Sequence, residues 1–159
     1  MAIISILSIV IFKSVQDAHL AARISSARGE LKSIHTAIVQ LANDTEKWPF
    51  GCTIGLAADI EEYLSETQSG LHNAPIPGTI DTCTWTAGDI GNWNGPYLLD
   101  IEPDPWGNNY LLDTDYHPYE NCPSTPSLQT RPVILSFGPN GAGINAYDCD
   151  DIFISLPSI

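Results

Sequence analysis

The sequence opens with MAIISILSIVIF (residues 1–12) and runs without a proline as far as Pro49. Residues 1–12 carry no charge and no helix breaker, and the only glycine before Pro49 is Gly29. A residue that precedes proline is biased away from the helical region. We therefore predict one continuous helix over residues 2–46, roughly 65–70 Å long at 1.5 Å per residue.

The second half of this helix has one apolar face. Apolar residues recur there at spacings of three and four, which is typical of a helix packed on a core: Ala27, Leu31, Ile34, Ile38 and Leu41. A small domain is only about 30 Å wide, so the first half should project. We expect residues 1–25 to form an apolar stem and residues 26–159 to form a globular head. The alternative is a helix buried in a larger bundle, but no other long helical pattern is present to build one. The apolar stem residues need lipid or other copies of the chain as cover; they are Ile3, Ile4, Ile6, Leu7, Ile9, Val10, Ile11 and Phe12.

Charge divides the chain at the same place. Residues 1–47 hold five basic and four acidic groups, a balance of +1, whereas residues 48–159 hold 15 acidic groups and Arg131, a balance of −14. The sum is the formal net charge of −13. So acidic a head repels phosphate backbones, which excludes nucleic acid as its partner.

The sequence of the head predicts short helices and strands joined by loops. All 12 prolines and 11 of the 12 glycines lie beyond residue 48. The spacing of apolar residues predicts a short helix over residues 56–65, followed by a long ordered loop over residues 67–96. Short strands are expected at Tyr110–Leu112, Val133–Phe137 and Ile152–Ile154, with a tight turn at residues 139–141. The fold class is therefore α+β, a long N-terminal helix packed on a small antiparallel sheet.

The four cysteines, at positions 52, 83, 122 and 149, all lie in the head. No C-x-x-C pair occurs, which argues against a zinc ribbon or a thioredoxin-like motif. Two disulfides in an oxidising compartment fit an even number of widely spaced cysteines. Three pairings are open, and we favour Cys52–Cys83 and Cys122–Cys149 because each closes a local excursion rich in proline and glycine. Buried free thiols are the alternative.

Four motifs follow one another in the head: Asn92-Trp-Asn-Gly-Pro-Tyr-Leu98, Asp104-Pro-Trp-Gly-Asn-Asn-Tyr110, Ser136-Phe-Gly-Pro-Asn-Gly141 and Asp150-Asp-Ile152. Together with the stem, they resemble the major pseudopilins of type II secretion systems, within the type IV pilin-like superfamily. That family carries W-x-G-P-Y-L, D-P-W-G-N-x-Y, S-x-G-x-D-G and a closing acidic string. The resemblance covers most of residues 2–154.

The resemblance implies a structural subunit that self-associates into a helical filament through its stem. Its implied partners are minor pseudopilins and an inner-membrane assembly platform. The implied location is the bacterial inner membrane, as a single pass with the head in the periplasm. The family's mature chain starts some ten residues before the point that aligns with Ala2, so we expect further apolar residues upstream; the other possibility is a genuinely short variant. No leader cleavage or methylation is assignable to any residue present.

The resemblance also implies calcium as a cofactor. The corresponding ligands are the side chains of Asn140, Asp148, Asp150 and Asp151 and backbone carbonyls around Leu135 and Ser136. Carboxylate, amide and carbonyl oxygens all suit calcium. Asn140 stands where the family has an aspartate, so one charge is lost. The alternative is an acidic turn that Cys149 holds without a metal.

The other candidate motifs indicate neither a further metal site nor a catalytic site. Asp113-x-Asp115 lacks the glycine and distal glutamate of an EF-hand and is read as a surface turn. The histidines are isolated, and no nucleophile pairs with a base, so we expect no catalysis. Two other functions remain open: a type IV pilin of an extracellular surface filament, used in adhesion or motility, and a membrane-anchored carbohydrate-binding module. The second would use a platform built from the tryptophans Trp48, Trp85, Trp93 and Trp106.

Overall fold

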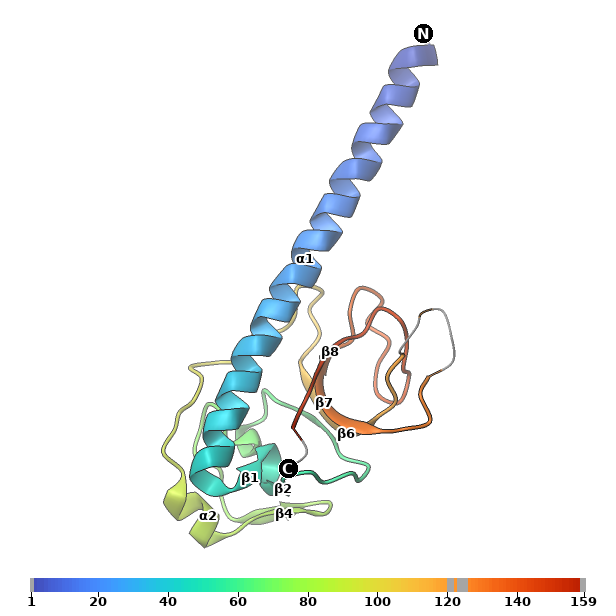
Figure 1. Cartoon of the computed structure of the whole chain (residues 1–159). Helices are drawn as coiled ribbons and strands as arrows, with labels where there is room; N and C mark the ends of the chain where they lie inside the picture. Colours follow the sequence, from blue (N-terminus) through green and yellow to red (C-terminus); the bar gives the residue numbers. More distant parts are fainter. Residues whose placement is uncertain (1, 120–121, 123–125, 158–159) are drawn as a thin grey trace.

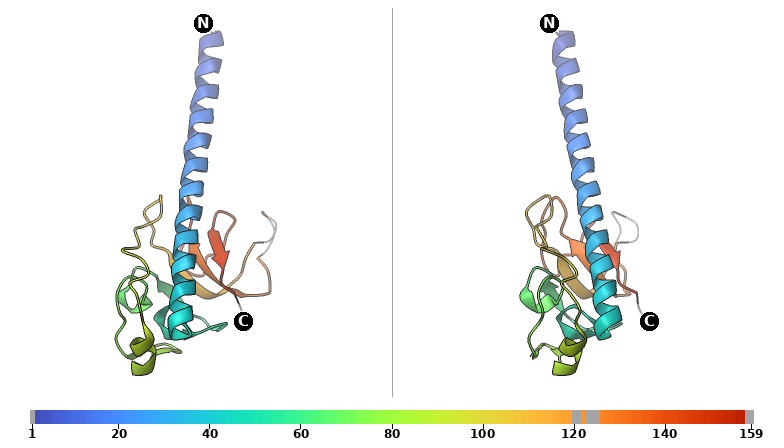
Figure 2. Two further views of the ribbon diagram at one scale, coloured as in Figure 1. Left: turned by 60° about the vertical axis from the view of Figure 1, so that its left-hand side comes forward. Right: turned by 90° about the vertical axis from the view of Figure 1, so that its left-hand side faces the viewer.

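A single long helix dominates the computed structural model, which describes residues 2–119, 122 and 126–157, with side chains from residue 13 onward. Helix α1 (Ala2–Thr45) contains 44 residues, which confirms the predicted continuous helix. It ends where Glu46 adopts a left-handed φ of 57°, three residues before Pro49. In every view the N-terminal part of α1 extends well beyond the head (Figures 1 and 2).

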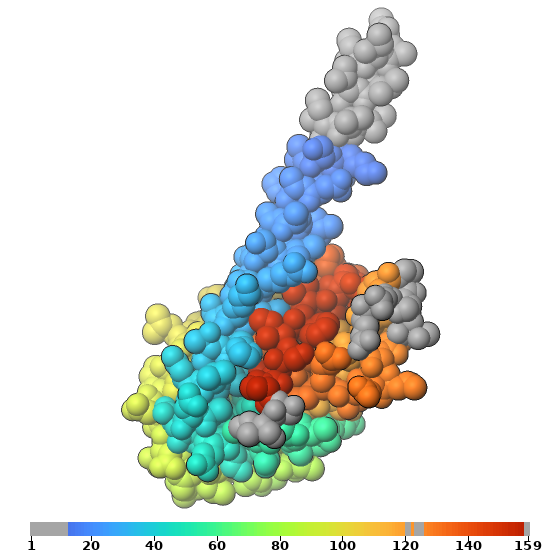
Figure 3. Space-filling model, viewed as in Figure 1, coloured from blue at the N-terminus to red at the C-terminus, as the bar shows by residue number. Residues whose placement is uncertain are grey.

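The two parts of α1 differ in burial. From residue 13 to residue 26 every side chain except Ile24 is exposed. Burial begins at Ala27 and follows one stripe of the helix, which is the predicted apolar face together with two further residues: Ala27, Leu31, Ile34, Ala37, Ile38, Leu41 and Thr45. The space-filling view accordingly shows the helix leaving the head as a free-standing rod (Figure 3).

An antiparallel sheet of four strands packs against the C-terminal half of α1. Its order is β3 (Glu61–Tyr63), β6 (Leu111–Tyr116), β7 (Arg131–Ser136) and β8 (Ile152–Ser155). The last three correspond to the three predicted strands, and the α+β class is confirmed. Leu112 and Ile134 face the core under α1, whereas Leu111, Val133 and Leu135 build a second, smaller core on the opposite face.

The helix predicted over residues 56–65 is wrong. This segment is irregular and then forms β3, the edge strand beside β6. Thr114 donates its amide N–H to the carbonyl of Ile60, and Leu64 donates to the carbonyl of Tyr110. These bonds to β6 satisfy the backbone across strands, so tertiary pairing overrides the helix-like apolar spacing.

The segment predicted as a long loop contains short elements. They are η2 (Thr67–Ser69), the hairpin of β4 (Gly78–Ile80) and β5 (Cys83–Trp85), and α2 (Ala87–Asn92). Helix α2 starts at a capping box, in which Thr86 and Asp89 each accept the other's backbone N–H. The chain between α1 and this segment forms β1 (Lys47–Trp48), η1 (Pro49–Gly51) and β2 (Cys52–Thr53).

Two disulfides hold the head together, and their pairing is the predicted one: Cys52–Cys83 and Cys122–Cys149. No cysteine is free, so the alternative of free thiols is wrong. Cys52–Cys83 is buried and joins β2 to β5, while Cys122–Cys149 lies at the surface. In the chain-entropy model, a disulfide that closes a loop of about 30 residues stabilises the folded state by roughly 3–4 kcal/mol.

Candidate functional site

The four side chains predicted to bind calcium lie together in the loop between β7 and β8. We call Asn140, Asp148, Asp150 and Asp151 the loop cluster. The loop turns tightly at residues 139–141, and both Gly138 and Gly141 have a φ of 63°. At Gly138 a Cβ atom would stand 2.1 Å from the carbonyl oxygen of Asp150. Only glycine allows the two arms of the loop to approach this closely.

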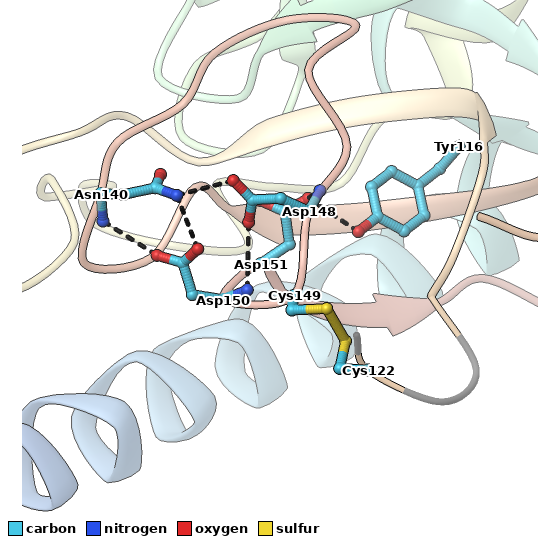
Figure 4. The surroundings of a disulfide bond; sticks show 7 residues. All are labelled: Tyr116, Cys122, Asn140, Asp148, Cys149, Asp150 and Asp151. Atoms are coloured by element: carbon cyan, nitrogen blue, oxygen red, sulfur yellow. Dashed lines mark hydrogen bonds between the residues drawn. A yellow bond between two sulfur atoms is a disulfide. The ribbon is translucent and has the colours of Figure 1, made fainter. Parts of the chain in front are cut away.

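The amide of Asn140 links two carboxylates of the loop cluster (Figure 4). Its Nδ2 donates to Asp148 Oδ2 and to Asp150 Oδ1, both at 2.6 Å. Its backbone N–H donates to Asp150 Oδ2 at 2.9 Å. Burial opposes ionisation of Asp148, yet hydrogen bonds from Asp150 and Asn140 lower its pKa below the ordinary value. Burial and the hydrogen bond to Asp148 raise the pKa of Asp150. The amide nitrogen thus stands where a cation would neutralise two acids.

Asp151 connects the loop cluster to the sheet. Its Oδ2 accepts a hydrogen bond of 2.8 Å from the hydroxyl of Tyr116 and one of 3.2 Å from the N–H of Asp148. Its Oδ1 is buried and has no partner among the described residues. Burial raises the pKa of Asp151 to about 6. An all-oxygen donor set with one buried, unused carboxylate oxygen fits a hard cation such as calcium.

The two predicted carbonyl donors lie in β7. Leu135 pairs with Leu111 and Phe153, and Ser136 pairs with Ile152. The hydroxyl of Ser136 donates to Asp104 Oδ2 at 2.5 Å, so this side chain is committed to another part of the head. The loop cluster gathers the four predicted side-chain ligands, while the two predicted carbonyl donors belong to β7. Cys149 anchors the loop cluster through the disulfide to Cys122 (Figure 4).

A second acidic group, which the sequence analysis missed, lies on and next to the sheet. We call Asp59, Glu61, Asp113 and Asp115 the sheet cluster. The interpretation of Asp113-x-Asp115 as a surface turn is wrong, because both residues belong to β6 and Asp113 is only 2% exposed. Burial, together with the charges of Asp115 and Glu61, raises the pKa of Asp113 to about 8. Burial and the charges of Asp59 and Asp115 also raise the pKa of Glu61.

The tryptophans contribute to packing. Trp48 and Trp85 are 1% and 2% exposed, so neither can belong to a surface platform. Trp93 and Trp106 are half-buried and pack against the main core. The indole N–H of Trp93 donates to the carbonyl of Gly70 at 2.8 Å.

Two tyrosines of the head fasten α1. Tyr97 donates its hydroxyl to Asp44 Oδ2 at 2.8 Å, and Tyr110 donates to Glu30. Burial raises the pKa of Tyr97 to about 12. Because the two contacts are separated along α1, they fix the direction in which the stem leaves the head.

The backbone of the predicted stem is helical from Ala2 onward. The side chains of Ile3, Ile4, Ile6, Leu7, Ile9, Val10, Ile11 and Phe12 lie outside the described residues. Within the described residues, none of the helices combines the length and apolar character needed to cross a membrane. Comparison of the chain with protein-family models, with curated proteins and with solved structures finds no match.

Proposed function

We propose that this chain is a structural subunit of a type IV pilin-like filament, and specifically the major pseudopilin of a type II protein secretion system. The observation that carries the proposal is the 44-residue helix α1, of which one half packs on an α+β head and the other half projects. In the described part of the projecting helix, from residue 13 to residue 26, every side chain except Ile24 is exposed. Side-by-side packing with the stems of other copies would cover these side chains.

The surface of the stem supports self-association. Val15 and Leu20 are 48% and 41% exposed on the projecting part of α1. Large apolar side chains on an isolated rod are an aggregation liability unless another surface covers them. In the proposed filament, stems fill the centre and acidic heads face the solvent. The location that goes with this function is the bacterial inner membrane and periplasm, with minor pseudopilins and an inner-membrane assembly platform as partners.

Calcium at the loop cluster belongs to this proposal. Asn140 Oδ1 and the carboxylates of Asp148, Asp150 and Asp151 would hold the ion, in place of the bridge that Asn140 Nδ2 makes. The ion would supply positive charge that neutralises the carboxylates and orders the loop. The disulfide at Cys149 holds the same loop covalently.

A type IV pilin of a surface filament is the second candidate, because an exposed filament also profits from two disulfides. The carbohydrate-binding module is weaker, since Trp48 and Trp85 are buried. In the native host, a secretion defect without long extracellular filaments on deletion of the gene favours the pseudopilin. Loss of long surface filaments favours the pilin.

Assembly itself is tested with the purified full chain. Detergent is diluted away, and filaments are counted by negative-stain electron microscopy. Leu20→Asp places a charge in the stem and should abolish filaments. The matched control is Ile76→Asp, because Ile76 is apolar and 65% exposed but lies in the head. Filaments that survive Leu20→Asp, or that fail equally in both variants, would contradict packing through the stem.

A further inference from the structure

The sheet cluster brings together carboxylates from the neighbouring strands β3 and β6 and from the segment just before β3. Glu61 of β3 lies directly opposite Asp113 of β6. Asp59, Glu61 and Asp115 can each place one carboxylate oxygen so that all three lie within 4.8 Å of one another. Calcium–oxygen distances are about 2.3–2.6 Å, so two oxygens on opposite sides of one calcium ion lie about 4.6–5.2 Å apart. The separation of the three carboxylate oxygens is therefore compatible with one shared ion.

Asp113 is a separate, buried observation that points to the same place. Its side chain is 2% exposed and stands opposite Glu61 in the ladder. Its Oδ1 accepts the backbone N–H of Asp115 at 3.0 Å. A carboxylate this deeply buried is costly unless a positive charge or a proton compensates it.

Two further oxygens in the sheet cluster lack a partner. Glu61 Oε1 and Asp115 Oδ1 are both buried from solvent, and within the described residues neither accepts a hydrogen bond. Buried polar atoms are paired in the great majority of cases, so two such carboxylate oxygens side by side need an explanation. A cation between them would satisfy both at once.

The loop that carries the loop cluster also reaches the sheet cluster. Asn145 donates its Nδ2 to Glu61 Oε2 at 3.2 Å, and Tyr147 donates its hydroxyl to Asn145 Oδ1 at 3.0 Å. These contacts use Oε2 of Glu61, and Oε1 stays without a hydrogen-bond partner among the described residues. The loop thus covers the cluster without neutralising it.

We propose that Asp59, Glu61 and Asp115, above the buried carboxyl of Asp113, form a calcium site that is separate from the loop cluster. Calcium suits it better than magnesium, because calcium accepts irregular sets of six to eight oxygens whereas magnesium requires near-ideal octahedral geometry and retains its waters. The ion would join β3 to β6 and remove the repulsion among four acids. This proposal does not rest on filament assembly.

Calcium bound per chain, measured by equilibrium dialysis of the full-length protein, tests the site. The double variant Glu61→Gln/Asp115→Asn should bind one calcium fewer than the wild type. Glu62→Gln is the matched control, because it removes the same charge from the same strand outside the cluster; it should bind as the wild type does. Asp150→Asn reports on the loop cluster and should leave the sheet site intact, so failure at one cluster is distinguished from failure at the other.

Thermal unfolding supplies a second readout, in which the difference in melting temperature between the double variant and the wild type should change sign when calcium is added. In chelator the double variant should melt at a higher temperature than the wild type, because fewer like charges repel. In millimolar calcium the order should reverse. A double variant that melts higher in both conditions would show that shared protons, not an ion, relieve the cluster, and it would overturn the proposal.

A milder variant guards against misfolding. Asp59 is exposed, so Asp59→Asn should fold normally and weaken calcium binding at this site about tenfold, since affinity follows the number of charged ligands. Unchanged affinity in Asp59→Asn, or an equal number of bound ions in the double variant and Glu62→Gln, would contradict the site. Tighter binding of magnesium than of calcium would contradict the choice of ion.

Discussion

The hydroxyl of Tyr97 donates a hydrogen bond of 2.8 Å to Oδ2 of Asp44, one residue before the end of α1. The same hydroxyl accepts the backbone N–H of Asn94 at 3.1 Å. One side chain therefore ties the α2 region to the C-terminal end of α1. Removing it should loosen both attachments.

Tyr97→Phe should lower the free energy of unfolding by about 1–2 kcal/mol, since a hydrogen bond to a charged acceptor is lost while the ring remains. Thermal or urea unfolding of the full chain measures the change. Leu99→Ala serves as the control, because Leu99 is 96% exposed. Equal stability of Tyr97→Phe and the wild type would mean that this contact does not hold the C-terminal end of α1.

Asp104→Ala should destabilise the head by about 3 kcal/mol or more, because it leaves several buried donors without an acceptor. Asp104 is 4% exposed and accepts from the N–H groups of Trp106 and Asn108 and from the hydroxyl of Ser136. Denaturant titration measures the loss. Asp100→Ala, at an exposed position nearby, should cost much less, and a similar cost in both would contradict this role for Asp104.

Gly138→Ala should be severely destabilising, by several times the ~1 kcal/mol of an ordinary substitution. The new Cβ would stand 2.1 Å from the carbonyl oxygen of Asp150, at a φ of 63°. Gly143→Ala is the matched change in the same loop, because nothing lies within 4 Å of the Cβ built there. Comparison of melting temperatures decides, and similar values for the two variants would refute the close approach.

Mild reductant should open Cys122–Cys149 well before Cys52–Cys83. Cys122 and Cys149 are exposed, whereas Cys52 and Cys83 are 0% and 1% exposed, and thiol exchange requires access to a sulfur atom. Alkylation at intervals followed by mass spectrometry gives the order. Simultaneous loss of both bonds would indicate that the head opens as a unit.

Without metal ions, stability should fall as pH rises from about 4 to 8. The pKa of Asp113 is raised to about 8 in the folded state, and the ordinary value is 3.8. The folded chain therefore holds a proton that the unfolded chain has released in this range, and each increase in pH favours unfolding. Asp151, at about 6, acts in the same direction over the lower part of the range. Asp113→Asn should flatten the profile, and a profile unchanged by Asp113→Asn would contradict the shift.

The elements that could be predicted from the sequence are those that a local pattern of apolar residues encodes. The stripe from Ala27 to Leu41 defines α1, and short apolar runs separated by turn residues define β6, β7 and β8. Such a pattern fails at residues 56–65, where Ile60 and Leu64 have helical spacing but the backbone pairs with β6. A partner strand distant in sequence decides that segment, and no local pattern reports it.

The two acidic clusters show the same limit. Asn140 and Asp148–Asp151 are close in sequence, on the two arms of one loop, so their meeting is predictable. Glu61 and Asp113 meet only through the pairing of β3 with β6, which the helical interpretation of residues 56–65 concealed. The two-residue spacing from Leu111 to Asp113 was the available signal, because it puts Asp113 on the same face of β6 as an apolar side chain.

The short distance between the end of α1 and Cys52 has a mechanical consequence. Between an anchor on the stem and an anchor at residue 83, the covalent path follows α1 to Thr45 and the β1–β2 pair to the buried Cys52–Cys83 bond. The disulfide excludes the residues between Cys52 and Cys83 from this path, so they cannot extend under load while the bond is intact. We expect single-molecule pulling between the stem and residue 83 to show high rigidity until the disulfide is reduced.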